Sequence, residues 1–348
     1  MKFELTKKYL AQLATLIEEK SDISLQKELD KLHAADVAEI IDELSFNQAS
    51  HLYELLEDEK AADVLMELED DLREQLLETL SPQEIAEEVI DNLESDDAAD
   101  IVSELSQDIK EEVFSHIEDL EHASDIADLL NYSEDSAGGL MAKELIKVNI
   151  NWTVMRCVRE MRKQAEDVSF VYTIYVVDDN DILLGTLSLK KLLLTDAKTI
   201  ITDIYKQDII MVNATEDNEE VGNIMNKYDL IVLPVVNDLG QLIGRITVDD
   251  VMEVMKEEAE KDYQMASGIS EDVESSDSVW TITRARLPWL LIGMVGGLLG
   301  AKVIGVFDIE KNYQMAFFIP LIAAMGGNVG VQSAAIVVQG LAGGSVSI

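Results

Sequence analysis

The sequence has a single cysteine, Cys157, and few basic residues: 27 Lys and Arg stand against 69 Asp and Glu. One cysteine excludes an intramolecular disulfide framework and a zinc site built from cysteine ligands. The shortage of Lys and Arg argues against a nucleic-acid partner, because phosphate contacts require clustered basic side chains. The hydrophobic content of 47% is too high for a disordered acidic chain. At 348 residues, the chain is long enough for two or three domains with cores of their own.

The negative charge is distributed unevenly along the chain. Residues 1–135 hold 40 acidic and 9 basic residues, residues 136–279 hold 27 and 14, and residues 280–348 hold 2 and 4. Three compositional regimes on one chain indicate three physical environments, so we expect a multidomain protein.

The last regime predicts an α-helical membrane region. Residues 287–307 are apolar apart from Lys302, and residues 312–348 include no charged residue. About 20 apolar residues span a bilayer as a helix, so we expect two transmembrane helices in contact with membrane lipid. Arg284 and Arg286 precede the first segment, and the N-terminus resembles no signal peptide. By the positive-inside rule we expect a multi-pass plasma-membrane protein whose N-terminal domains are cytoplasmic.

The first regime predicts an all-α domain of short amphipathic helices at residues 1–137. The pattern ADVAEIIDEL at 35–44 recurs loosely at four later places, which are 61–68, 83–93, 98–105 and 124–130. Apolar residues at i, i+3 or i+4, and i+7 give each segment one buried stripe. Such repeats predict a stacked superhelix. Ser81 and Ser95 are expected to cap the helices that follow them.

The acidic residues of this domain fall on the solvent faces of the predicted helices. For any single Asp, a solvated helix surface is the simplest interpretation. Taken together, the 40 acids repel one another and destabilise the compact state unless cations screen them. Because Mg²⁺ and Ca²⁺ prefer carboxylate oxygens, we expect the domain to respond to divalent cations.

The central region contains an internal duplication. Residues 171–193 and 230–255 each read as strand, turn, strand and helix, and amphipathic helices precede them at 154–163 and 218–227. The paired phrases IYVVD…LLGTLSL and LPVVND…GQLIGRITVDDV resemble a tandem pair of CBS domains, an α+β module. The resemblance places repeat 1 at 138–200 and repeat 2 at 201–256.

The resemblance to CBS domains implies that ATP or another adenine nucleotide binds between the repeats. The ribose-binding element of that family is a Ser or Thr followed three residues later by Asp, and repeat 2 has it as Thr247 and Asp250. Repeat 1 has Ser188 but Lys191 in place of the Asp, while Lys190 would suit a phosphate. A purely structural pair is the alternative.

A further resemblance covers the whole chain. The second apolar segment contains MGGNVGVQSAAIVVQGLA at 325–342, and YSEDSAGGLM at 132–141 joins the acidic domain to the CBS pair. With a long connecting helix at 248–283 and a membrane region at 284–348, this organisation looks like the MgtE family of Mg²⁺ channels. The resemblance implies a homodimer, with Mg²⁺ as both ligand and transported ion. It also implies that cytosolic Mg²⁺, bound between the domains, closes the pore.

The resemblance further implies two sets of functional residues. The Mg²⁺-sensing acids would be Asp96, Asp97 and Asp100 in the N domain, Asp217, Glu219 and Asp229 around the second CBS helix, and Asp250, Glu253, Glu258 and Asp262 on the connecting helix. The pore residues would be Gly326, Gly327, Asn328 and Gln332, for which helix packing is the alternative. Lys261 stands where the family pattern has an acid.

Two functional hypotheses remain open on the sequence. The family has five transmembrane helices, and this sequence includes the first two. The first hypothesis is a Mg²⁺-gated Mg²⁺ channel that lacks the last three helices. The second is a non-conducting sensor or regulatory subunit that binds Mg²⁺ and an adenine nucleotide. An enzyme is disfavoured, because the sequence has no phosphate loop, no Ser-His-Asp order and no metalloprotease His pair.

Overall fold

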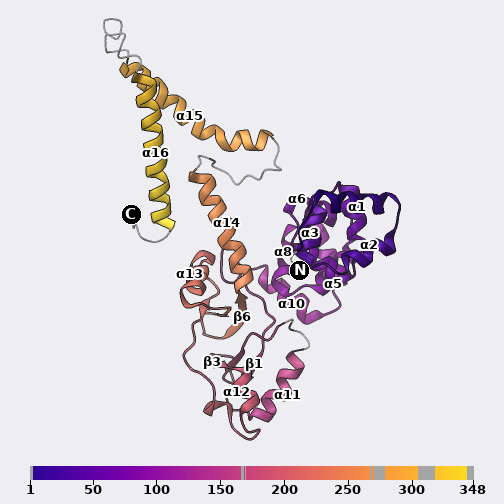
Figure 1. Cartoon of the computed structure of the whole chain (residues 1–348). Helices are drawn as coiled ribbons and strands as arrows, with labels where there is room; N and C mark the ends of the chain where they lie inside the picture. The colour runs from indigo at the N-terminus through magenta and orange to yellow at the C-terminus, as the bar shows by residue number, and fades with distance from the viewer. Residues whose placement is uncertain are drawn as a thin grey trace. The chain divides into compact units, whose positions relative to one another are not determined.

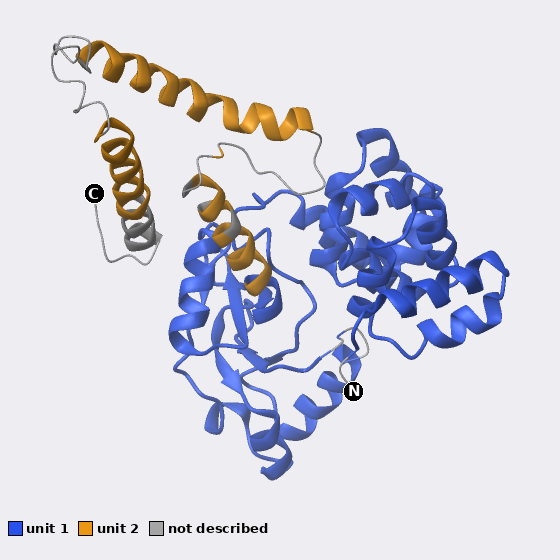
Figure 2. Ribbon diagram, turned by 45° about the horizontal axis from the view of Figure 1, so that its top comes forward, with its two compact units in different colours: residues 1–251 blue, residues 252–348 orange. Residues whose placement is uncertain are grey.

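The computed structural model describes residues 3–165, 168, 170–266, 269, 279–304 and 318–342. The chain forms two compact units, Met1–Val251 and Met252–Ile348 (Figure 2). The first unit contains a helical domain followed by a pair of small α+β repeats. The second contains most of the connecting helix and two apolar helices.

The N-terminal domain is entirely helical (Figure 1). Its elements in chain order are α1 (Lys7–Glu18), α2 (Asp22–Leu29), α3 (Ala34–Asp42), α4 (Phe46–Tyr53), α5 (Asp58–Met66), α6 (Asp70–Leu77), α7 (Pro82–Glu84), the π-helical turn η1 (Ile85–Val89), the 3₁₀ turn η2 (Ile90–Asn92), α8 (Ser95–Glu104), α9 (Gln107–His116) and α10 (Leu120–Leu129). The predicted all-α domain is therefore confirmed.

The buried stripes follow the predicted helical spacing. In α3, Val37, Ile40 and Ile41 are fully buried, at i, i+3 and i+4. In α8, Ile101 and Val102 are fully buried in the same cluster. Each such side chain contributes about 1.5–3 kcal/mol relative to an exposed position, so packing of the apolar faces holds these short helices together.

The two predicted helix caps differ in outcome. Ser81 forms a complete capping box with Glu84: its hydroxyl accepts from the Glu84 N–H, and its own N–H donates to the Glu84 carboxylate at 2.7 Å. The prediction for Ser95 is wrong, because Glu94 is the N-cap of α8 and Ser95 is its first helical residue. The hydroxyl of Ser95 is buried and bonds to Glu144, far away in the sequence.

The two α+β repeats have identical topology, as the internal duplication predicts. Repeat 1 contains β1 (Lys147–Asn149), α11 (Val154–Gln164), β2 (Ile174–Val177), β3 (Leu183–Leu187) and α12 (Leu189–Leu194), and the 3₁₀ turn η3 (Ile201–Asp203) follows it. Repeat 2 contains β4 (Val212–Asn213), α13 (Asn218–Tyr228), β5 (Val232–Val236), β6 (Leu242–Thr247) and the start of α14 (Val248–Ala266). In each sheet the first pair of strands is parallel and the second is antiparallel.

Two glycines let a neighbouring chain segment approach a strand closely. Gly185 lies on β3, where Thr186 exchanges backbone hydrogen bonds with Lys206 at 2.8 and 2.9 Å. Gly244 occupies the matching place on β6, where Arg245 pairs with Ala142. A Cβ atom at Gly185 would lie 2.1 Å from the Lys206 carbonyl oxygen, which no side chain can tolerate without movement of the backbone.

The helical domain and repeat 2 share a continuous apolar core. Ala137 and Met141 of the junction belong to the same buried cluster as the N-terminal helices and the strands of repeat 2. Backbone hydrogen bonds join the junction to repeat 2: the Ala137 N–H donates to the Glu216 carbonyl at 2.7 Å, and the Gly138 N–H to the Ala214 carbonyl at 2.8 Å. This shared core fixes the helical domain beside the first turn of α14.

The second unit contains α14 from Met252 onward, α15 (Val279–Ile304) and α16 (Phe318–Ala342). In the part of the chain that the structure describes, one helix is long and apolar enough to cross a membrane, with Val279–Val303 at a mean hydropathy of 1.3. The fold class expected from the sequence is confirmed: a helical domain, a CBS-like pair, a connecting helix and an apolar helical region.

Candidate metal site

Carboxylates from separate parts of the chain meet beside the N-terminus of α8. One oxygen from each of Glu94, Asp96 and Glu144 lies within 4.8 Å of the other two. Glu94 is the N-cap of α8 and Asp96 lies in its first turn, whereas Glu144 precedes β1. They line a groove of about 1270 Å³ that Asp97 and Asp250 also line. We call this groove, with these five acids, the candidate metal site.

Ser95 ties the two sides of the site together. Its N–H and hydroxyl donate to the two carboxylate oxygens of Glu144, at 3.1 and 2.8 Å. Its hydroxyl oxygen in turn accepts from the backbone N–H of Lys143, at 2.9 Å. The Glu144 carboxylate therefore sits at the N-terminal end of α8, where the helix dipole favours a negative charge.

Asp250 enters the groove from the first turn of α14. Its carboxylate accepts the backbone N–H of Thr247 at 3.0 Å and the Thr247 hydroxyl at 2.5 Å. A Ser or Thr that precedes a helix and pairs with an acid three residues on is a helix-start motif. The spacing singled out for ribose binding thus also stabilises the start of α14, and it fixes the Asp250 side chain at the groove.

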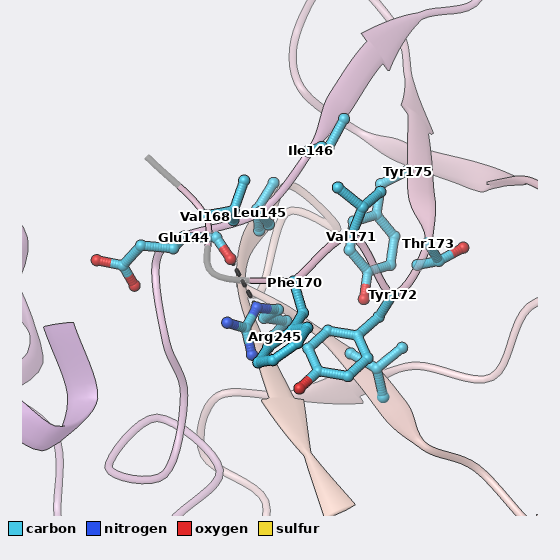
Figure 3. A pocket seen from close by; sticks show the side chains of 11 residues that line it. Glu144, Leu145, Ile146, Val168, Phe170, Val171, Tyr172, Thr173, Tyr175 and Arg245 are labelled. Atoms are coloured by element: carbon cyan, nitrogen blue, oxygen red, sulfur yellow. Dashed lines mark hydrogen bonds between the residues drawn. The ribbon is translucent and has the colours of Figure 1, made fainter. Parts of the chain in front are cut away.

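A buried arginine lies among these acids. Arg245 on β6 is 4% exposed, and its Nε–H donates to the Glu144 carbonyl at 2.6 Å. Its Nη2 donates to the Glu94 carboxylate. Figure 3 shows the guanidinium beside Tyr172, whose ring centre is 5.3 Å from the Arg245 Cζ. This arginine therefore connects the helical domain, the junction and repeat 2.

Burial raises the pKa of two of the acids, Asp96 and Asp250. The pKa of Asp96 is raised well above its ordinary value, first by burial and then by the neighbouring charges of Asp97 and Asp250. The pKa of Asp250 is also raised by burial, although its hydrogen bonds from Thr247 oppose the shift. Both residues thus disfavour ionisation in this fold, and a bound cation would relieve that cost.

Glu144 behaves in the opposite way. Burial alone would raise its pKa, but the nearby His122 and the hydrogen bonds from Ser95 lower it on balance. The Nδ1 of His122 lies 3.7 Å from the Glu144 carboxylate, and its Nε2 lies 3.1 Å from the Ile90 carbonyl. Contact with Glu144 raises the pKa of His122, against the effect of its burial. Glu144 is therefore held as a carboxylate.

The donor set suits a hard divalent cation. Mg²⁺ binds oxygens at about 2.0–2.1 Å, so two ligands on opposite sides of the ion lie about 4.2 Å apart. The spacing of up to 4.8 Å between Glu94, Asp96 and Glu144 fits such an ion after a small side-chain rotation, or with a water as one ligand. All the ligands are oxygens, which Mg²⁺ and Ca²⁺ prefer over nitrogen or sulfur.

Comparison with known proteins gives this geometry a family context. Residues 32–135 match the family profile described as MgtE intracellular N domain, and residues 137–197 and 201–257 match the CBS domain. A solved structure, the cytosolic domain of the Mg²⁺ channel MgtE in complex with ATP, is 33% identical, with a TM-score of 0.65 over 70% of this chain and 99% of that one. The chain belongs to the MgtE family.

Curated members of the MgtE family extend the comparison. The magnesium transporter MgtE of Thermus thermophilus is 37% identical over 218 residues, which are 62% of this chain and 48% of that protein. The magnesium transporter MgtE of Bacillus subtilis is 32% identical over 215 residues, or 61% and 48%. The chain therefore spans about half the length of the curated relatives that it matches.

The structure gathers only some of the acids that the MgtE resemblance implies. Asp96, Asp97 and Asp250 line the same groove. Asp100 is exposed on α8 and does not line it. The three acids around α13 also lie elsewhere: Asp217 is the N-cap, Glu219 is in the first turn, and Asp229 ends the helix in the left-handed conformation with φ of 52°.

The remaining predicted sites lie in the second unit or on repeat 1. Glu253 is exposed on α14, and Glu258 pairs with Lys261 at 2.8 Å, while the side chain of Asp262 lies outside the described residues. The pore candidates on α16, which are Gly326, Gly327, Asn328 and Gln332, are all exposed. Ser188 precedes α12 and Lys190 lies on it; both are exposed, and neither lines the groove.

Sequence reasoning missed three residues of the site. Glu94 lies two residues before Asp96, and on the sequence alone it reads as a surface acid like its neighbours. Glu144 and Arg245 are 101 positions apart in sequence and are joined by a hydrogen bond from the Arg245 Nε–H to the Glu144 carbonyl. The available signal was Arg245 itself, the one charged residue of strand β6.

Proposed function

We propose that this chain functions in Mg²⁺ transport, as part of a Mg²⁺-selective channel or transporter that is gated by cytosolic Mg²⁺. The observation that carries the proposal is the meeting of Glu94, Asp96 and Glu144 within 4.8 Å, at a junction between two domains. Mg²⁺ is proposed as the transported ion because curated members of the MgtE family are named magnesium transporters. We propose no enzymatic activity for the chain.

The gating mechanism follows from electrostatics. With Mg²⁺ bound, the candidate metal site holds the helical domain and repeat 2 together. Without it, the mutual repulsion of Asp96, Asp97 and Asp250 weakens the contact between the two domains. Connecting helix α14 begins at Val248, and Asp250 in its first turn accepts a hydrogen bond from Thr247, so the start of the helix responds to the state of the site. The further acids Glu253, Glu258 and Asp262 on α14, and Asp217, Glu219 and Asp229 around α13, would add to this response.

The assembly that we propose is a homodimer in the plasma membrane. The pore would involve Asn328 with Gly326, Gly327 and Gln332 on α16, in a multi-pass membrane domain in contact with lipid. The helical domain and the CBS pair would face the cytoplasm, because Arg284 and Arg286 lie at that end of α15.

The second candidate is a sensor or regulatory subunit that binds Mg²⁺ without conducting it. The observation that favours it is that the candidate metal site is built entirely from residues of the unit Met1–Val251, so ion binding requires no residue of α15 or α16. Mg²⁺ flux into liposomes separates the two: flux through this 348-residue chain, or through a version extended to five membrane helices, supports the channel, and Mg²⁺ binding without flux through either supports the subunit.

The Mg²⁺ response of the site can be tested by proteolysis. Lys143 adjoins Glu144, is 11% exposed and pairs with Asp128, so trypsin reaches it only after local opening. Millimolar Mg²⁺ is expected to slow cleavage of the Lys143–Glu144 bond in the full chain, because the bound ion closes the site. Cleavage after exposed Lys190 on α12 serves as the internal control and should not change. Equal rates at Lys143 with and without Mg²⁺ would refute the proposed site.

An adenine nucleotide is a second proposed ligand, at Ser188, Lys190, Thr247 and Asp250 of the CBS pair. A related solved structure of the MgtE cytosolic domain contains ATP. Calorimetric titration with ATP in Mg²⁺-free buffer is expected to give saturable binding that Lys190→Ala weakens severalfold, through loss of a phosphate contact. An absence of binding heat would leave the CBS pair as a structural module.

A further inference from the structure

The candidate metal site already contains a positive charge of its own. The Arg245 side chain is 4% exposed, yet three acids contribute to the electrostatics of its guanidinium: Glu94, Asp96 and Asp250. Burial of a cation at this depth is costly unless carboxylates and hydrogen bonds compensate it. The surrounding acids provide that compensation, so Arg245 and the acidic cluster depend on each other.

The contacts of Arg245 cross the boundary between the two domains. Its Nη2 donates to the carboxylate of Glu94 in the helical domain. Its Nε–H donates to the backbone carbonyl of Glu144 in the junction, at 2.6 Å. The residue itself lies on β6 of repeat 2, where its backbone N–H donates to the Ala142 carbonyl at 2.9 Å. One guanidinium thus joins three segments that a cation in the groove would also join.

The guanidinium has contacts on several sides. Figure 3 shows it in a small pocket between the Glu144 segment and the ring of Tyr172. Strand pairing fixes the backbone, and stacking near Tyr172 fixes the head group. An arginine can donate in two fixed directions at once, which a lysine ammonium cannot match in this geometry.

We propose that Arg245 is a built-in cation that holds the helical domain against repeat 2 when no metal is bound. Mg²⁺ then adds to an existing clamp, and the ion enters a site whose charge is already partly neutralised. Only the statement about Mg²⁺ rests on the proposed Mg²⁺ site. The clamp itself is a statement about Arg245, Glu94 and Glu144.

The test compares Arg245→Met with the parent chain in EDTA, by trypsin cleavage at the Lys143–Glu144 bond. Methionine keeps much of the side-chain length and removes the charge. Cleavage is expected to be at least about tenfold faster in the variant, because the half-buried Glu94 carboxylate loses its partner. Saturating Mg²⁺ is expected to restore slow cleavage, while Arg245→Lys should lie between the two proteins in EDTA.

Two variants control for a simple loss of folding. Arg162→Met removes an exposed arginine on α11 and should cleave like the parent chain. Adding Glu94→Gln to Arg245→Met should slow cleavage again, because the unpaired carboxylate is neutralised; a general folding defect would not be rescued in this way.

The outcomes separate the two proposals. Equal cleavage of Arg245→Met and the parent chain in EDTA would overturn the clamp, as would failure of Glu94→Gln to rescue a fast-cleaving Arg245→Met. Fast cleavage of Arg245→Met in EDTA with rescue by Glu94→Gln, but with no effect of Mg²⁺ on any protein, would uphold the clamp and refute the Mg²⁺ site.

Discussion

In Mg²⁺-free buffer near neutral pH, a chain that carries Asp96→Asn and Asp250→Asn is expected to be more stable than the parent chain. Burial raises the pKa of both carboxyls, so the folded state favours their neutral forms over the charged ones. Their stabilising contribution is present below their unfolded-state pKa of about 4 and is lost as the pH rises through the raised folded-state values. Two neutral amides remove that loss, and we expect a gain of about 1–3 kcal/mol.

The same double variant is expected to lose its response to Mg²⁺. A ligand at 100 times its dissociation constant stabilises the folded state by about 2.7 kcal/mol, and the parent chain should show a gain of this order. Thermal unfolding followed by circular dichroism, with and without millimolar Mg²⁺, measures both effects. Asp100→Asn is the matched control, because Asp100 lies on the same helix but outside the groove. A double variant that responds to Mg²⁺ like the parent chain would remove Asp96 and Asp250 from the site.

The second large effect is expected from Gly185→Ala in β3. The new methyl group would lie 2.1 Å from the Lys206 carbonyl oxygen and 2.9 Å from the Tyr205 ring. Because a backbone atom is in the way, the strand or its neighbour must shift, and the two hydrogen bonds between Thr186 and Lys206 are displaced. We expect a loss of about 3 kcal/mol in the free energy of unfolding, measured by urea denaturation.

The pseudo-equivalent substitution Gly244→Ala gives an internal comparison. There the nearest atom is the Sδ of Met141 at 2.6 Å, in a side chain that can shift, and the nearest backbone atom, the Ala142 carbonyl oxygen, is farther away at 2.9 Å. The expected loss is about 1 kcal/mol, smaller than for Gly185→Ala. Gly300→Ala on α15 is the neutral control, since no described atom beyond the adjacent residues and backbone of its own helix lies within 4 Å of the added carbon. Equal losses in the free energy of unfolding for Gly185→Ala and Gly300→Ala would contradict the prediction, because the close approach at β3 would then cause no destabilisation.

Local patterns were enough to predict the elements and their order. The apolar spacing in α3 and α8 identified the buried faces, because a helix repeats its face every three or four residues. The duplicated strand-turn-strand-helix pattern predicted two repeats with the same topology. The Ser81 cap was predictable for the same reason, because its partner Glu84 is only three residues away.

The sequence by itself therefore determined the elements, the family and the excess of negative charge. Only the tertiary structure decided which of the 69 acids share a site. Ser95 reads as a helix cap, yet its hydroxyl bonds to Glu144 across 49 positions. Arg245 reads as one charge in a strand, yet it pairs with Glu94 across 151 positions. Such contacts arise from packing between domains, where burial and charge compensation depend on distance in space, which no local periodicity encodes.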